Sequence, residues 1–234
     1  MNPKQRAAGV LLHLTSLPGP HGIGDFGPDA YRFVDWLHSA KQTLWQWLPT
    51  TPVGPGDSPY QSPSAFAGSP LMVALEPLVE RGWLERVELP ADGFSNARVD
   101  FPRVIPWRDE HLRRAAQGFV ARAKPDERAA FAAWCQREAP WLDEYALFMA
   151  LFNAHGMKPW WEWAAGVRRR DADDLAKART DHAKEIAFQR FVQWCWDEQC
   201  RALKTYANAK GIALVGDIPI YVADNSADVW SRPD

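Results

Sequence analysis

Three short apolar runs recur along the chain, and turn-forming residues bound each of them. They are GVLLH at 9–13, TLWQWL at 43–48 and IALV at 212–215. Continuous apolar runs of this length are typical of strands buried on both faces, as in parallel sheets. The pattern therefore predicts three buried strands that run parallel in one sheet or barrel.

Helical periodicity fills the segments between these runs. Pro28 opens a predicted helix, because proline suits a first helical turn, and its inward face is Ala30, Phe33, Val34, Leu37 and Ala40. A short helix is expected at 76–82, closed by a glycine. From Trp107 to His155 the apolar spacing of three and four predicts helical segments broken at Pro125 and Pro140.

The stretch before the third strand predicts one long amphipathic helix. It covers about 173–210 and ends at Gly211. Residues 84–104 show no clear period and are expected to be irregular, with a possible edge strand. Strands linked by helices in the order β-α-β, a long helical stretch and β predict an α/β fold.

Composition excludes several classes of function. The chain has 234 residues, 47% of them hydrophobic and 24% charged, with a net charge of −2. Nothing in this balance attracts a polyanion, so no nucleic-acid partner is expected. The apolar runs are too short for a membrane span, and the first is too short for a signal peptide. We therefore expect a cytoplasmic protein with no membrane partner.

Two residue types add to this picture. Thirteen tryptophans are an unusual share, and their flat apolar faces suit either a large core or stacking against sugar rings. The three cysteines are odd in number and fit no zinc-binding spacing. We expect Cys135, Cys195 and Cys200 to be reduced core thiols, and no bound metal.

Prolines and glycines recur in PVGPGDSPYQSPSAFAGSP, the loop at 52–70. Proline fixes φ, so such a loop is stiff and presents side chains with little ordering cost. The side chains it offers suit recognition of a polyol: Asp57, Ser58, Tyr60, Gln61, Ser62 and Ser64. The alternative is an ordinary surface loop that closes one end of the sheet.

Acidic residues follow the third predicted strand. Asp217 follows its end after Gly216, where parallel α/β folds place functional groups; a helix or turn cap is the alternative. For Asp224 and Asp228 we expect capping or solvation, and Asn225 or Ser226 is expected to cap the short helix SADVW.

The remaining candidates lie near strands or turns. His13 ends the first strand and is either a cleft residue or a structural one. Trp45 and Trp47 are expected in the core, whereas the tryptophans of PWWEW at 159–163 offer a sugar platform or a purely structural turn.

Four separated motifs resemble one family, in the order in which that family carries them: GVLLHLTSLPGPHGIGDFG, GDSPYQSPSAFAGSP, WLDEYALFMAL and GDIPIYVADNSADVW. The chain resembles the amylomaltases, or 4-alpha-glucanotransferases, of glycoside hydrolase family 77, from about residue 8 to its end. The resemblance implies the N-terminal part of a (β/α)8 TIM barrel with a helical insertion between strands two and three. The expected parts are 1–83 with the first strands and the loop, 84–170 as the insertion, and 171–234 with the return helix and third strand.

The resemblance also implies an activity. It is the transfer of α-1,4-glucan segments between maltodextrins by a retaining double displacement, without a cofactor. Two carboxylates about 5–5.5 Å apart perform such a reaction. The family's Arg-x-Asp-His nucleophile motif is not present; Arg98-Val99-Asp100 has no following histidine and is expected to be structural. No catalytic residue is therefore expected here: the nucleophile and the acid/base are expected beyond residue 234.

Substrate binding is what the resemblance carries over by position. Tyr60 and Ser58 match the family's SPYQS motif, with Gln61 beside them, and Asp217 matches the aspartate of GD-x-PI. Pro55 replaces a tyrosine that some relatives use at a second glucan site. Two alternatives stay open: a non-catalytic α-glucan-binding protein, and an α-glucan hydrolase on the same barrel.

Overall fold

The computed structural model describes residues 6–89 and 93–232, which divide into two compact units. The first, here called the sheet unit, holds the described residues within Met1–Thr50, Gly68–Ala123 and Cys195–Ile218. The second, here called the helical unit, holds those within Thr51–Ala67, Lys124–Trp194 and Pro219–Asp234. Each unit has its own cluster of buried apolar side chains.

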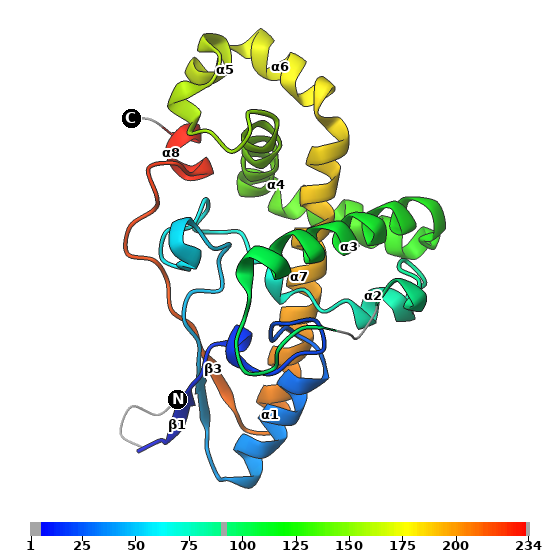
Figure 1. The fold of residues 1–234 in the computed structure, drawn as a ribbon, viewed down its shortest axis with the longest axis vertical. Coiled ribbons are helices and arrows are strands. Elements are labelled where there is room, and N and C mark those ends of the chain that lie inside the picture. The colour runs from blue at the N-terminus through cyan, green and yellow to red at the C-terminus, as the bar shows by residue number, and fades with distance from the viewer. Residues whose placement is uncertain (1–5, 90–92, 233–234) are drawn as a thin grey trace. The chain divides into compact units, whose positions relative to one another are not determined.

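The sheet unit is built on three parallel strands in the order β1-β2-β3 (Figure 1). They are β1 (Gly9–Leu11), β2 (Leu44–Gln46) and β3 (Ala213–Val215). Their register aligns Leu11 with Gln46 and Gln46 with Val215. The predicted parallel pairing is confirmed, although each strand is shorter than its apolar run.

Two helices cover this sheet: α1 (Pro28–Ser39) and the part of α7 (Ala183–Ala209) that begins at Cys195 (Figure 1). Proline occupies the first turn of α1, as the sequence predicts. The side chains that join helices and sheet in the core are Val34, Leu37, Trp45, Trp47, Leu203 and Ala207. The assignment of both strand tryptophans to the core is thus confirmed.

A buried ion pair links the loop after β1 to helix α3 (Phe101–Arg122). The Arg108 guanidinium donates to Asp25 Oδ2 at 3.0 Å and also to the Val73 carbonyl. Asp25 Oδ1 accepts from the Gly27 backbone N–H at 2.9 Å, directly before α1. Burial raises the pKa of Asp25, and the nearby Arg108 charge opposes that shift.

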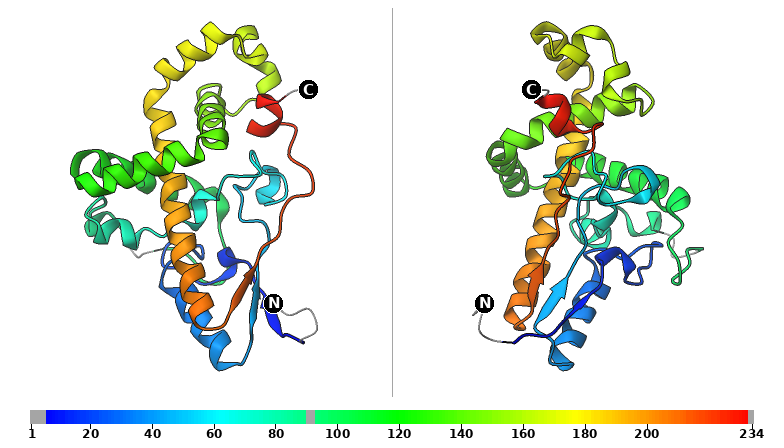
Figure 2. Two further views of the ribbon diagram at one scale, coloured as in Figure 1. Left: turned by 180° about the vertical axis from the view of Figure 1, so that it is seen from behind. Right: turned by 90° about the vertical axis from the view of Figure 1, so that its left-hand side faces the viewer.

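The helical unit packs around α4 (Pro125–Ala154), with α5 (Ala165–Arg169), α6 (Ala172–Asp181), the start of α7 and α8 (Ala227–Ser231). Helix α8 packs against α4 (Figure 2). Large rings fill its core: Tyr145, Phe148, Trp163 and Trp230.

Proline positions account for two differences from the sequence prediction. Pro140 does not break a helix, because it lies inside the continuous α4. A proline removes one helical hydrogen bond, but Trp134 and Leu142 are buried on either side and hold both halves in place. Pro106 likewise lies inside α3, so that helix begins at Phe101 rather than at Trp107.

One further prediction was wrong, and the edge strand considered for residues 84–104 is not found in the described residues. The single helix expected at 173–210 is divided at His182 into α6 and α7. Backbone hydrogen bonds of 3.0 Å from His182 to Ala178 and from Ile186 to His182 continue across the division, and no glycine or proline marks it. No strand lies in the described residues 84–89 and 93–104; residues 90–92 lie outside the described part.

Loss of the Arg108 side chain should destabilise the protein strongly. In Arg108→Met, Asp25 stays buried without its counter-charge and the Val73 carbonyl loses its donor. We expect a loss of about 3–5 kcal/mol in the free energy of unfolding, measured by denaturant titration.

The matched control is Arg32→Met, which removes an exposed arginine paired with Asp29. Exposed pairs contribute about 0–1 kcal/mol. If the two substitutions lowered the free energy of unfolding equally, the buried pair would contribute no more to stability than an exposed pair.

Candidate functional site

The loop after β2 is held in a tight turn at its tip. Gly56 and Asp57 both have positive φ, at 70° and 58°. The Asp57 N–H donates to Gly54 O and the Gly54 N–H donates to Ser58 O, both at 3.0 Å. A Cβ on Gly54 would lie 1.7 Å from Gln61 O, so glycine is required where the two arms of the loop approach each other.

Serine hydroxyls fix the return arm of this loop. Ser62 Oγ donates to Ser64 O at 2.8 Å, and Ser64 Oγ accepts from the backbone N–H groups of Phe66 and Ala67. Ser62 and Ser64 are only 3% and 2% exposed. The expectation that they are available to a ligand was therefore wrong, because they bond the backbone of their own loop, as serine often does in turns.

The predicted contacts nearer the tip are presented outward. Tyr60 is 44% exposed and Gln61 is also exposed. Ser58 is half-buried, and its Oγ accepts from the Tyr60 backbone N–H at 3.3 Å. Thr51 Oγ1 donates to Pro59 O at 2.9 Å. The aromatic ring thus stands on a backbone fixed at two points.

His13 and Asp217 lie in the sheet unit, each two residues beyond aligned strand positions. Leu11 and Val215 are both in register with Gln46. Because neighbouring strands lie about 4.8 Å apart, β1 and β3 are separated by about 10 Å. The sheet therefore brings these two residues to one edge, where the carboxyl ends of its strands lie.

The two side chains differ in their surroundings. Asp217 is exposed, and its Oδ1 accepts from the Ile218 N–H at 2.9 Å. His13 is half-buried, and burial lowers its pKa from 6.5 to about 4. Its Nδ1 is buried without a hydrogen-bond partner among the described residues. The edge therefore carries an imidazole that is neutral at neutral pH, and the exposed side chain of Asp217.

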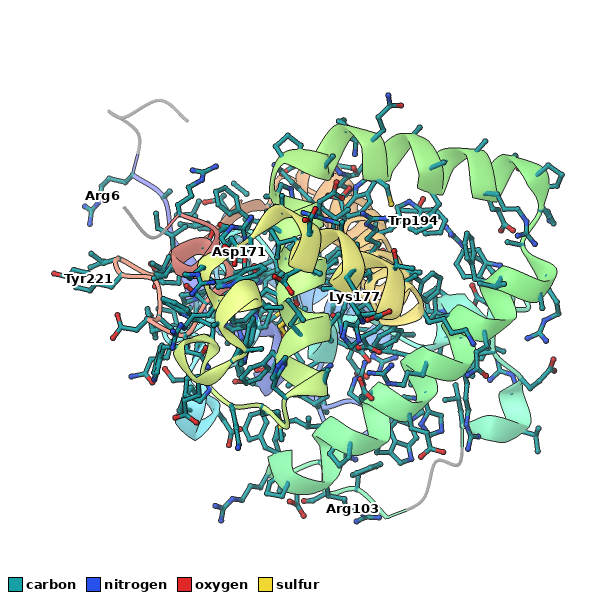
Figure 3. All side chains as sticks on the ribbon, turned by 90° about the horizontal axis from the view of Figure 1, so that it is seen from above. Arg6, Arg103, Asp171, Lys177, Trp194 and Tyr221 are labelled. Carbon is teal, nitrogen blue, oxygen red and sulfur yellow. The ribbon has the colours of Figure 1, made fainter. Side chains whose placement is uncertain are left out.

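The segment after Asp217 exposes apolar side chains that the sequence analysis did not single out. Ile218, Ile220 and Tyr221 are 76%, 87% and 82% exposed. Figure 3 shows Tyr221 pointing outward from this segment. The apolar run IPIYV at 218–222 was the available signal, because an apolar run outside any helix or strand is seldom left without a packing partner.

The PWWEW turn does not form a continuous sugar platform. Trp163 is 3% exposed and belongs to the core of the helical unit. Trp160 donates from Nε1 to Asp224 O at 2.9 Å, which ties the turn to the segment before α8. Trp161 is 44% exposed and Trp160 is half-buried, so Trp161 has the most accessible ring of the three.

The other acidic and amide residues have structural roles in the described part of the chain. Ser226 Oγ accepts from Val229 N and caps α8, while Asn225 Oδ1 accepts from Trp160 N. Asp228 Oδ2 accepts from Ala65 N at 2.9 Å. Asp100 lies at the start of α3 and its carbonyl accepts from Arg103 N. A structural role for Arg98-Val99-Asp100 stays a prediction.

The cysteines are unsuited to nucleophilic chemistry. All three are unpaired, and burial raises the pKa of Cys135 and of Cys200 to about 11. They therefore remain thiols at neutral pH. Among residues 6–89 and 93–232, no group of three histidine, cysteine or acidic side chains could hold a metal ion. Within the same residues, no helix has the length and hydropathy that a membrane span requires.

The fold and these residues define a class of protein. A parallel sheet covered by helices, with polar side chains just past its strand ends, is the arrangement in which α/β proteins bind ligands at the carboxyl edge.

Comparison with known proteins makes the assignment specific. Residues 12–234 match the family model described as 4-alpha-glucanotransferase, and the chain belongs to that family. It is 49% identical over 229 residues to the 4-alpha-glucanotransferase of Thermus thermophilus, covering 98% of this chain and 45% of the relative. The Synechocystis sp. 4-alpha-glucanotransferase is 40% identical, with 98% and 46% covered.

A solved structure agrees with this assignment. It is the amylomaltase from Streptococcus agalactiae in complex with acarbose, with a TM-score of 0.93 and 37% identity, covering 98% of this chain and 46% of that one. The α/β fold is therefore that of an amylomaltase segment. The chain spans a little under half the length of these relatives.

Acid should reveal the burial of His13. Its folded pKa lies below the ordinary value, so its contribution to stability is complete above about pH 6.5 and is lost as the pH falls through about 4. In that window the unfolded chain binds a proton that the folded chain excludes. Between pH 7 and pH 4, His13→Gln should lose about 1–3 kcal/mol less stability than the wild type, measured by denaturant titration.

The exposed His38 provides the comparison, since His38→Gln makes the same chemical change outside the sheet edge. Parallel pH profiles for the wild type and His13→Gln would contradict the assignment of a neutral, buried imidazole.

Proposed function

We propose that the complete protein is a 4-alpha-glucanotransferase that transfers α-1,4-glucan segments between maltodextrins. The observation that carries the proposal is the family match over residues 12–234. The stiff loop that presents Tyr60 and the sheet edge that presents Asp217 support it, because both offer contacts suited to sugars. The acarbose complex of the Streptococcus agalactiae amylomaltase supports an α-glucan-like ligand for this family.

We propose that the three parallel strands are the first part of a (β/α)8 barrel, with 84–170 as a helical insertion. Parallel order, helices against the sheet and polar residues past the strand ends support this architecture. In such a barrel His13 and Asp217 would lie on the catalytic face. The cytoplasmic location stays a prediction; a potato relative carries the description chloroplastic/amyloplastic.

The proposed reaction is a retaining double displacement. A carboxylate attacks the anomeric carbon while a protonated carboxyl group gives its proton to the departing O4, which breaks the glycosidic bond. The resulting base then takes the proton from an acceptor's 4-hydroxyl, whose oxygen displaces the enzyme carboxylate. Residues 1–234 contain no Arg-x-Asp-His motif, so we propose that both carboxylates come from outside them.

The residues of this chain would then act by positioning. Tyr60 offers a ring face, or its hydroxyl, to one sugar, Ser58 and Gln61 offer polar contacts, and Asp217 and His13 hold hydroxyls at the sheet edge. An acceptor sugar held in place competes with water through its effective concentration. Transfer rather than hydrolysis therefore depends on such contacts.

The full-length gene product should convert maltotriose to glucose and longer maltodextrins, as chromatography of the products would show. Residues 1–234 alone should release no glucose, because the reacting carboxylates are absent. A hydrolase would instead generate new reducing ends without longer products, and a binding protein would leave maltotriose unchanged.

Tyr60 should matter for its ring. We expect Tyr60→Ala to lower kcat/KM for maltotriose about tenfold, while Tyr60→Phe, which keeps the stacking face, stays closer to the wild type. Steady-state kinetics on the full-length protein would measure both. Trp36→Ala, which removes an aromatic side chain 53% exposed on α1, is the control. An effect of Tyr60→Ala no larger than that control would remove Tyr60 from the substrate contacts.

A further inference from the structure

A cavity lies inside the helical unit, at the other end of the loop that carries Tyr60. Its volume is about 360 Å³, within the range of about 300–1,000 Å³ typical of small-molecule sites. Four parts of the helical unit form its walls: the loop, helix α4, helix α8, and Arg170, which directly follows α5. The lining residues include Phe66, Trp141, Glu144, Tyr145, Arg170 and Asp228. Tyr60, Ser58 and Gln61 do not line it.

Two buried polar atoms in these walls have no hydrogen-bond partner among the described residues: the Tyr145 hydroxyl and Arg170 Nη1. Tyr145 is 1% exposed, and burial raises its pKa, so the hydroxyl stays protonated. Buried polar groups are rarely left unpaired, because desolvation without a new hydrogen bond costs free energy. An occupant of the cavity with hydroxyl or other polar atoms would supply the missing hydrogen-bond partners.

An aromatic wall faces the same cavity. Phe66 is 62% exposed and stacks on Trp141, with ring centroids 6.4 Å apart and planes at 21°. Both rings line the cavity. Such rings suit a ligand with an apolar face as well as polar edges, as a pyranose ring has.

The charges around the cavity are balanced within the wall. Arg170 donates to Glu144 at 2.7 Å and lies 4.3 Å above the Trp230 ring. Glu144 also lies 3.6 Å from Arg179, and Asp228 accepts from Ala65 N. With Arg232 also present, both signs are represented. A neutral ligand rich in hydroxyls fits this lining better than an ion does.

We propose that this cavity binds a glucose unit of an α-1,4-glucan, with the sugar ring against Phe66 and Trp141 and its hydroxyls bonded to Tyr145 and Arg170. The proposal rests on the proposed function, which supplies the glucan. The loop would then contact glucan at two places, through Tyr60 near its tip and through Phe66 on its return arm.

Binding is measured on the full-length protein by its retardation in native gels that contain soluble glycogen. Phe66→Ala removes a mostly exposed ring, and Tyr145→Phe removes a single hydroxyl. Each substitution should raise the apparent dissociation constant for glycogen, obtained from the retardation, by about threefold to tenfold. The matched controls are Trp36→Ala, another exposed ring, and Tyr31→Phe, another tyrosine hydroxyl, and both should retain wild-type retardation.

Melting temperature separates a sugar from a protein occupant. Without glycogen, Tyr145→Phe should melt at the wild-type temperature, and the stabilisation that glycogen gives the wild type should be smaller in the variant. A clear loss of melting temperature without glycogen would show that another segment of the protein bonds the hydroxyl, and would overturn the proposal.

Unchanged retardation in both cavity variants would overturn it as well. Because the gel measures binding and not turnover, its result is independent of glucose release from maltotriose. A full-length protein that fails to disproportionate maltotriose, yet loses retardation in these variants, would refute the proposed transferase activity and support the sugar site.

Discussion

The contact between Asp25 and Arg108 organises the sheet unit. One carboxylate bonds the start of α1 through Gly27 and an arginine of α3, and that arginine also bonds the backbone at Val73. Loop, helix and a distant turn are thus joined in an environment closed to water. A buried charge needs its partner, so the loop after β1 can adopt this course only while α3 is in place. His13, which directly precedes this loop, depends on the same geometry.

The candidate contact residues are held in two ways, one in each unit. At the sheet edge, the parallel register decides which residues meet, and His13 and Asp217 follow from it. In the loop after β2, prolines, a glycine at Gly54 and short serine hydrogen bonds hold the backbone, and Tyr60 stands on it. Both arrangements reduce the conformational entropy that these side chains would lose when a ligand binds.

Periodicity predicted the strands, α1 and the core tryptophans, because these depend on local apolar pattern and on burial in one sheet. It failed at Pro140, where packing on both sides of α4 outweighs a lost hydrogen bond, and at His182, which carries no local signal. The sequence showed that the loop is rich in serine. It did not show that Ser62 and Ser64 form hydrogen bonds with the backbone of their own loop. The cavity at Tyr145 was hidden from the sequence, since its walls come from distant segments. The division at 83/84 and 170/171 stays a prediction.

The segmental make-up of the helical unit has a consequence for how this protein can be engineered. The chain passes between the two units at 50/51, 67/68, 123/124, 194/195 and 218/219. Ala67 from the loop and Trp230 from α8 share a core with Phe148 of α4. Excision of 124–194 would therefore strip two other segments of their packing partner, and a graft of that stretch alone would arrive without part of its core. An exchange of the helical unit therefore has to include all three of its segments. Substitutions in the core of one segment should require compensating substitutions in the others.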